Sequence, residues 1–134
     1  MTDDEKHFER LHALVVDDDQ SMISLIATVL QSMGVRRIER ALDGDRALEM
    51  FQNDPNIVDF VICDWMMPKM SGLELLKQVR KLNSDIPFLM LTAKSTIDAV
   101  KLATDAGVSQ FLTKPFTPID LQKRVRAMTK ELVK

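Results

Sequence analysis

Acidic, hydroxyl and amine side chains follow short apolar runs at four places in this chain. The four sets are Asp17-Asp18-Asp19 after "ALVV" (13–16), Asp64 after "DFVIC" (59–63), Thr92 after "PFLML" (87–91) and Lys114 after "SQFLT" (109–113). An isolated buried carboxylate is costly in free energy, so a lone aspartate at the end of an apolar run needs partners from elsewhere in the chain. The repeated pattern predicts one shared polar site.

The chemistry of these side chains favours a cation and a phosphoryl group. Carboxylates a few ångströms apart repel each other, so they either raise their pKa or bind a cation. Lys114 can neutralise one charge, and the remaining oxygens suit Mg²⁺ or Mn²⁺. A Mg²⁺ with open coordination positions is a site for a phosphoryl group. Thr92 and Lys114 can then contact phosphoryl oxygens.

Five apolar runs supply the strands that position these residues. The runs at 13–16, 59–63 and 87–91 are continuously apolar, which is typical of parallel strands covered on both faces. The runs at 36–42 and 109–113 are more mixed, which suits the edges of a sheet. Ligands of such sheets bind beyond the carboxyl ends of the strands, where all four sets of side chains fall.

Helical spacing fills the intervals between the runs. The first predicted helix carries Met22 to Met33 and ends before Gly34, and the second carries 47–51. The third begins at Ser71, and the fourth extends from near Ser95 to Gly107. The fifth begins at Thr117, with Pro118 in its first turn. Strand and helix therefore alternate five times. This pattern predicts the α/β class, a (βα)5 doubly wound five-stranded parallel sheet. We expect one domain over residues 11–132 after a flexible lead-in over residues 1–10.

Composition narrows the function classes. The chain has 134 residues and a formal net charge of −2, which argues against a general nucleic-acid binder. It has no membrane-length apolar run and no signal-peptide pattern, and its single cysteine, Cys63, cannot form an internal disulfide. These features predict a cytoplasmic location. The glycines form no phosphate-binding motif, which disfavours a nucleotide-binding enzyme, and three aspartates in the first loop disfavour a flavin phosphate.

Four segments together resemble a known family. "LVVDDDQSM", "VICDWMMPKMSG", "LMLTAK" and "FLTKPF" are similar to the receiver domain of bacterial response regulators, most closely the CheY-like stand-alone type of chemotaxis. The resemblance implies a flavodoxin-like sheet of strand order 2-1-3-4-5. It also implies a phosphoprotein of two-component signal transduction, one that catalyses its own phosphorylation and dephosphorylation and is not a separate enzyme.

The resemblance implies roles for the acidic residues. Asp64 is the expected phosphoacceptor, which forms an aspartyl phosphate. Asp18, Asp64 and the backbone carbonyl of Met66 are the expected direct ligands of the magnesium ion, and Asp17 acts mainly through a metal-bound water.

It also implies roles for the other side chains at the site. Thr92 is the switch hydroxyl next to Ala93, Lys114 pairs with the aspartate or the phosphoryl group, and Phe111 is the switch aromatic. Lys114-Pro115 resembles the family's cis peptide. Met66 and Lys94 replace the asparagine and glutamate of CheY-like proteins at positions that tune dephosphorylation, so the lifetime of the phosphate and the action of an auxiliary phosphatase stay open.

The implied partners are proteins. A sensor histidine kinase would supply the phosphoryl group, and the surface over residues 95–132 would bind a motor, a kinase or a histidine phosphotransfer protein. We expect a monomer that contacts neither nucleic acid nor membrane. The last predicted helix is basic, which fits a solvated face or an acidic partner; its cations are Lys123, Arg124, Arg126 and Lys130.

Other interpretations of the same residues exist. Asp17 to Asp19 could merely cap a helix, Asp64 could be a turn residue, and Thr92 and Lys114 could lie in solvent. A phosphorelay intermediate is an alternative function. A haloacid-dehalogenase-type phosphohydrolase with Asp17 as nucleophile is less favoured, because no late acidic pair follows Lys114. A receiver-like module without phosphorylation is also disfavoured, since every acidic residue and the lysine are present.

Overall fold

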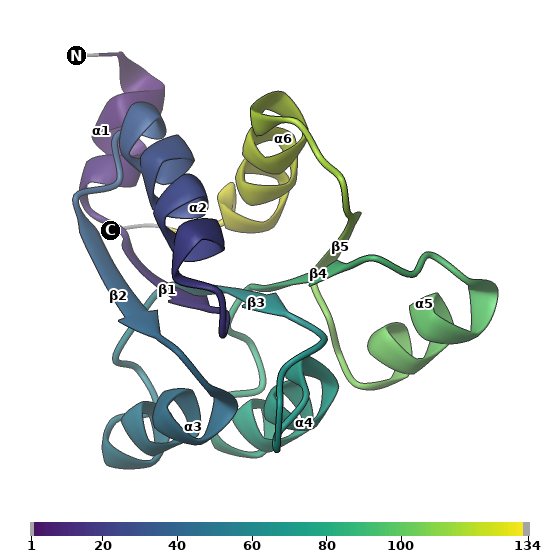
Figure 1. The fold of residues 1–134 in the computed structure, drawn as a ribbon. Coiled ribbons are helices and arrows are strands. Elements are labelled where there is room, and N and C mark those ends of the chain that lie inside the picture. Colours follow the sequence, from purple (N-terminus) through teal and green to yellow (C-terminus); the bar gives the residue numbers. More distant parts are fainter. Residues whose placement is uncertain (1, 133–134) are drawn as a thin grey trace.

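The computed structural model describes residues 2–132, which form a parallel sheet with helices on both faces (Figure 1). The strands are β1 (His12–Val16), β2 (Arg37–Ala41), β3 (Phe60–Asp64), β4 (Phe88–Thr92) and β5 (Gln110–Thr113). Their order in the sheet is β2-β1-β3-β4-β5. The predicted doubly wound α/β fold and the strand order 2-1-3-4-5 are therefore confirmed.

Six helices in the described part of the chain cover this sheet. They are α1 (Asp3–Glu9), α2 (Gln20–Met33), α3 (Gly44–Asn53), α4 (Gly72–Leu82), α5 (Ile97–Asp105) and α6 (Pro118–Thr129). α1, α2 and α6 lie on one face, whereas α3 and α4 lie on the other with α5 beside them near β5 (Figure 1). No helix within residues 2–132 has the length and apolar character needed to cross a membrane.

The two apolar cores explain the continuous apolar strands. Side chains of β1, β3 and β4 alternate between a core under α2 and α6 and a second core under α3 and α4. Both faces of these central strands are buried, so neither face can carry a polar residue without loss of hydrophobic stabilisation. Polar residues are therefore confined to the strand ends.

Local capping explains where most helices begin. The side chains of Asp19, Ser71, Thr96 and Thr117 each accept a hydrogen bond from a backbone N–H in the first turn of α2, α4, α5 and α6. α2 ends at Gly34, whose φ of 112° lies in the left-handed region that glycine adopts without steric cost. These boundaries agree with the sequence patterns to within one or two residues.

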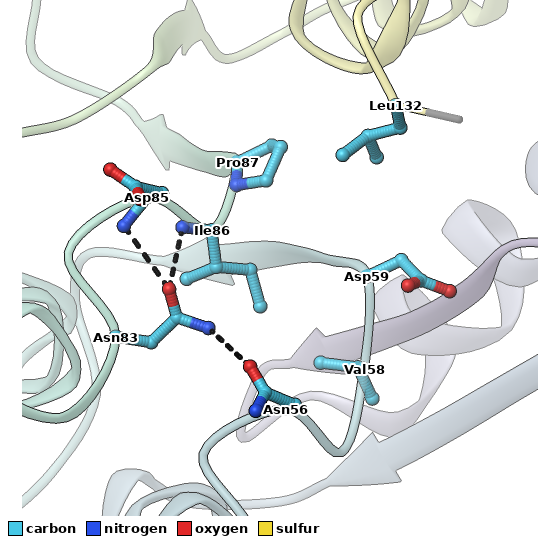
Figure 2. A pocket seen from close by; sticks show the side chains of 8 residues that line it. All are labelled: Asn56, Val58, Asp59, Asn83, Asp85, Ile86, Pro87 and Leu132. Carbon is cyan, nitrogen blue, oxygen red and sulfur yellow. Dashed lines mark hydrogen bonds between the residues drawn. The ribbon is translucent and has the colours of Figure 1, made fainter. Parts of the chain in front are cut away.

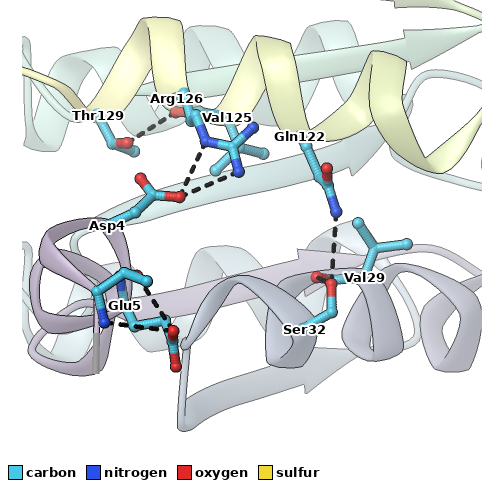
Figure 3. Close-up of polar contacts among 9 residues, drawn as sticks. Asp4, Glu5, Val29, Ser32, Gln122, Val125, Arg126 and Thr129 are labelled. Atoms are coloured by element: carbon cyan, nitrogen blue, oxygen red, sulfur yellow. Dashed lines mark hydrogen bonds and ion pairs between the residues drawn. The ribbon is translucent and has the colours of Figure 1, made fainter.

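The first ten residues differ from the expectation of a flexible lead-in. Residues 3–9 form α1, in which Thr2 and Glu5 make a capping box and Phe8 is fully buried in the core beside α2. Asp4 accepts a hydrogen bond from Arg126 of α6 at 3.1 Å (Figure 3). The sequence pattern missed this helix because one apolar side chain on a short acidic segment gives no helical periodicity.

Candidate functional site

Three carboxylates converge at the carboxyl ends of β1 and β3. Asp17 is 1% exposed and Asp64 is 6% exposed, whereas Asp18 lies in solvent. One carboxylate oxygen of each residue lies within 4.8 Å of the other two. The structure thus brings together the three carboxylates that the sequence assigns to a cation.

Lys114 extends from the end of β5 to this cluster. Its Nζ atom lies 2.8 Å from Oδ1 of Asp64, and both side chains are largely shielded from solvent. Its backbone N–H donates to the carbonyl of Thr92 at 2.7 Å, which holds the ends of β4 and β5 together. The Lys114-Pro115 peptide is cis, as the family resemblance implies. The ammonium therefore provides a fixed positive charge beside Asp64.

The surroundings of Asp17 raise the pKa of its carboxyl group. Burial of this carboxyl group raises its pKa from 3.8 to about 6, and the charges of Asp64 and Asp18 add to the rise. The backbone N–H of Asp19, which donates to Oδ1 at 2.9 Å, and the charge of Lys114 oppose it. Oδ2 is buried and has no hydrogen-bond partner. A cation at this oxygen would satisfy it and favour the ionised form.

The donor set fits a hard divalent cation. Three carboxylates and one lysine leave a net negative charge, and carboxylate oxygens are the ligands that Mg²⁺ and Mn²⁺ prefer. The family resemblance of the sequence implies Mg²⁺ in such an acidic pocket. The buried, unpartnered Oδ2 of Asp17 is the observation on this chain that supports the fit.

Asp19 has a different role from its neighbours. Its side chain caps α2 by accepting hydrogen bonds from the backbone N–H and the hydroxyl of Ser21, at 2.9 and 2.6 Å. These bonds hold the pKa of Asp19 below its ordinary value. The capping interpretation is therefore confirmed for Asp19, which is not one of the three clustered carboxylates.

Thr92 is buried at the carboxyl end of β4, next to the loop that leads to α5. The residue is 3% exposed, and its Oγ1 accepts a hydrogen bond at 3.0 Å from the backbone N–H of Lys94 in the loop that leads to α5. The solvated position that the sequence leaves open for Thr92 is therefore wrong. Ala93 and Lys94 are exposed. The threonine hydroxyl thus lies at the carboxyl end of β4, hydrogen-bonded to the loop that leads to α5.

A groove lies between this loop, α5 and the residues after Asp64. We call it the α5 groove; it measures about 240 Å³, and its lining includes Trp65, Met66, Thr92, Lys94 and Leu102. The side chain of Met66 is 66% exposed at this groove. The ring of Trp65 meets the half-buried ring of Phe111 edge to face, with 6.2 Å between the centroids. Of the predicted switch and rate-tuning residues, Met66, Thr92 and Lys94 line this groove and Phe111 packs on its Trp65 wall. Ala93 and Lys114 instead line a separate hollow beside Phe116.

The sequence patterns missed the importance of Gly72. A Cβ atom at this position would collide with the backbone carbonyl oxygen of Asp64 and would lie 2.9 Å from Cα of Trp65. The Gly72 N–H donates to the carbonyl of Trp65 at 2.8 Å. The residue thus lets α4 begin directly against the loop that carries the site. The only signal in the sequence is a glycine just after the capping Ser71, where most residues are tolerated.

A second hollow lies at the opposite end of the sheet. Residues before β3 and before β4 line a pocket of about 400 Å³, together with Leu132 (Figure 2). The side-chain oxygen of Asn83 accepts from the backbone N–H groups of Asp85 and Ile86, and its Nδ2 donates to Pro55. Its polar groups serve the local turn, so this pocket is not part of the site.

The fold and the site together define a class of proteins: doubly wound α/β domains with a carboxylate cluster and a lysine at the carboxyl edge of the sheet. A family model described as "Response regulator receiver domain" matches residues 13–126. The chain belongs to the response regulator receiver domain family, a family of signalling domains in two-component systems.

Similar proteins agree with this assignment. Response regulator MprA of Mycobacterium sp. (strain KMS) is 38% identical over 115 residues, which cover 86% of this chain and 49% of the relative. The chain thus spans about half the length of the curated relatives it matches. Chemotaxis protein CheY4 of Vibrio cholerae has 32% identity and a TM-score of 0.80, covering 88% of this chain and 98% of the other.

A second similar structure comes from a complex. A chain from the CheX-CheY-BeF3-Mg²⁺ complex of Borrelia burgdorferi is 27% identical, with a TM-score of 0.84 over 92% of this chain and 90% of the other. The family assignment replaces the haloacid-dehalogenase alternative. The structural relatives share the receiver fold over nearly their whole length.

Proposed function

We propose that this domain accepts a phosphoryl group on Asp64 and changes its surface for a protein partner in response. The observation that carries the proposal is the site itself: three carboxylates within 4.8 Å, with the Lys114 ammonium 2.8 Å from Asp64 Oδ1. The Borrelia burgdorferi relative was crystallised with beryllofluoride and magnesium, which supports this chemistry by analogy.

The transfer follows from the positions of the side chains. An oxygen of Asp64 attacks the phosphorus of a phosphohistidine from a sensor histidine kinase; the new O–P bond forms as the P–N bond breaks, and the imidazole leaves. Lys114 shifts from the carboxylate toward the phosphoryl oxygens and stabilises their charge. Asp17, Asp18, Asp64 and the Met66 carbonyl would hold Mg²⁺ or Mn²⁺, which supplies further positive charge when bound.

The response to phosphorylation uses Thr92. Its buried hydroxyl turns toward a phosphoryl oxygen and gives up the hydrogen bond from the N–H of Lys94. The loop before α5 then moves, and Phe111 changes its packing on Trp65. This shift in population alters the surface of α5, β5 and α6, which binds the partner. Hydrolysis of the acyl phosphate by water, in the surroundings of Met66 and Lys94, ends the signal.

The direct test is chemical. We expect the chain, incubated with acetyl phosphate and Mg²⁺, to gain the mass of one phosphoryl group, and borohydride trapping to place that group on Asp64. The Asp64→Asn variant should gain none, with Asp3→Asn on exposed α1 as a matched control that behaves as the parent. Labelling of Asp17, or equal labelling of Asp64→Asn, would contradict the proposal.

A further inference from the structure

One methionine differs from the others in its environment. Within residues 2–132, Met66 is the single methionine in the exposed class, at 66%, while Met67 is 9% exposed and Met90 is fully buried. The others are partly or fully buried. Thioethers react with hydroperoxides in proportion to their access to solvent, so this side chain is the preferred target of such an oxidant in the described chain.

The adjacent cysteine does not compete for the oxidant. Cys63 is fully buried, and its Sγ atom donates to the carbonyl of Asp64 at 3.2 Å. A thiol in this position has no path to solvent and stays in its unreactive protonated form. Oxidation near the site therefore falls on Met66.

Met66 also lies where a polar atom would matter. It is two residues from Asp64, so their Cα atoms lie within about 7 Å, the span of two residues. Its side chain and those of Thr92 and Lys94 line the α5 groove. A thioether is a weak hydrogen-bond acceptor, whereas a sulfoxide oxygen is a strong one. The change therefore places a new acceptor in the α5 groove, two residues along the chain from a nearly buried carboxylate.

We propose that Met66 is a site of reversible oxidation by hydroperoxides, and that its sulfoxide shortens the lifetime of the phosphoryl group on Asp64. The sulfur lone pair attacks the OH oxygen of the hydroperoxide, the O–O bond breaks, and the proton of that oxygen passes to the other oxygen, which leaves as water or an alcohol. Sulfur loses two electrons and the peroxide gains them. This inference rests on the proposed phosphorylation of Asp64.

The effect on lifetime follows from hydrogen bonding. The sulfoxide oxygen accepts a hydrogen bond from water at the mouth of the groove and orients that water toward the phosphorus. One such bond made in the transition state changes a rate by about fivefold. The oxidised domain then signals for a shorter time, and a methionine sulfoxide reductase restores the original lifetime.

The first measurement locates the oxidation. The full chain is treated with hydrogen peroxide, and peptide mass spectrometry follows sulfoxide formation at every methionine. We expect Met66 to react about tenfold faster than buried Met90, because a buried thioether is shielded from the oxidant. Equal rates at the two methionines would overturn the proposal.

The second measurement tests the consequence. Untreated and treated protein are freed of peroxide, loaded with acetyl phosphate, and followed for loss of the acyl phosphate. We expect the half-life to fall about fivefold on treatment in the parent and to stay constant on treatment in Met66→Leu, which keeps the volume but not the oxidisable sulfur. An equal fall in both, or no fall in the parent, would overturn the proposal.

Two further measurements test the hydrogen-bond mechanism and the proposed function separately. Met66→Gln carries a permanent side-chain acceptor, so its untreated half-life should be shorter than that of Met66→Leu; equal half-lives would count against the hydrogen-bond mechanism. Failure of the untreated parent to acquire phosphate on Asp64 would overturn the proposed function, whereas the oxidation of Met66 would still be measured in the first experiment.

Discussion

At the scale of single residues, the site depends on a carboxyl group, Asp17, whose ionisation costs more free energy in the folded protein than in the unfolded chain. Asp17 is desolvated by the strand end on which it lies, and Asp64 and Asp18 add repulsion. Its raised pKa means that the folded metal-free protein binds a proton there more tightly than the unfolded chain does. A cation that replaces this proton binds in competition with it.

This environment predicts an unusual dependence of stability on pH. Between pH 4 and pH 6 the folded state holds more protons on Asp17 than the unfolded state, so the contribution of Asp17 to the free energy of unfolding of the metal-free protein falls as pH rises through this range. Asp17→Asn removes the contribution and should stabilise the metal-free protein at pH 7.5 by roughly 2 kcal/mol. Urea unfolding at pH 4, 6 and 7.5, with chelator present, measures the dependence on pH and the effect of Asp17→Asn.

Magnesium should offset the destabilising effect of ionised Asp17 in the same experiment. Its addition at pH 7.5 should stabilise the parent and should stabilise Asp17→Asn much less, because one carboxylate of the cluster is gone. The exposed Asp3→Asn change serves as the control. A parent whose metal-free stability rises between pH 4 and pH 6, beyond the rise of Asp17→Asn, would contradict this account of Asp17.

At the scale of elements, the beginning of α4 fixes the loop after β3. Gly72→Ala introduces a Cβ that collides with the carbonyl of Asp64, and both groups belong to backbone that cannot move independently. We expect a loss of about 2 kcal/mol in stability and slower phosphorylation by acetyl phosphate. Denaturant unfolding and phosphorylation rates measure the two effects.

Gly44 provides a matched comparison. A Cβ there would lie 3.0 Å from Cβ, Cγ and Sδ of Met70, a side-chain contact that needs a small shift of Cβ and a rotation of the atoms beyond it. The residue is likewise in the first turn of its helix. Gly44→Ala should therefore cost much less stability and leave phosphorylation unchanged. Equal losses for the two variants would show that the contact with Asp64 is not what makes Gly72 necessary.

Phe8 is the one fully buried side chain of helix α1. Phe8 is fully buried against the α2 side of the sheet, so Phe8→Ala should lower the free energy of unfolding by about 3 kcal/mol. Asp4→Ala removes only the half-exposed ion pair with Arg126 and should cost less than about 1 kcal/mol. Similar small losses for both variants in denaturant unfolding would mean that α1 is not docked in solution.

These elements show which features a sequence alone can predict. The strands were predictable because burial on both faces leaves continuous apolar runs, and Asp17, Asp64, Thr92 and Lys114 were predictable because polar residues are confined to their ends. α1 was not, since its stability comes from Phe8 packing on distant elements. The unpartnered oxygen of Asp17 and the contact at Gly72 depend on distances between strands and loops that no local pattern contains.

At the scale of the whole molecule, two groups of elements have different strengths of attachment. α2, α3, α4 and α6 bury at least two apolar side chains each, whereas α5 buries only Ala103 and exposes Ile97, Val100 and Leu102. A helix with so little buried surface moves at low cost in free energy. The lightly attached helix is also the one whose leading loop donates to Thr92.

This arrangement predicts that Thr92 is needed for the response and not for phosphorylation. Thr92→Ala keeps Asp64, Lys114 and the acidic cluster, so acetyl phosphate should still label it, but the hydroxyl that links the cluster to α5 is gone. In the parent, beryllofluoride with Mg²⁺ should change amide hydrogen exchange over residues 95–132. In Thr92→Ala that change should be lost in α5, while the residues around Asp64 should still respond.

Thr28→Ala on the exposed face of α2 removes an equivalent hydroxyl far from α5 and should respond as the parent does. If α5 in Thr92→Ala responds as fully as in the parent, the signal reaches that helix by another path, and the contact between Trp65 and Phe111 becomes the next one to remove.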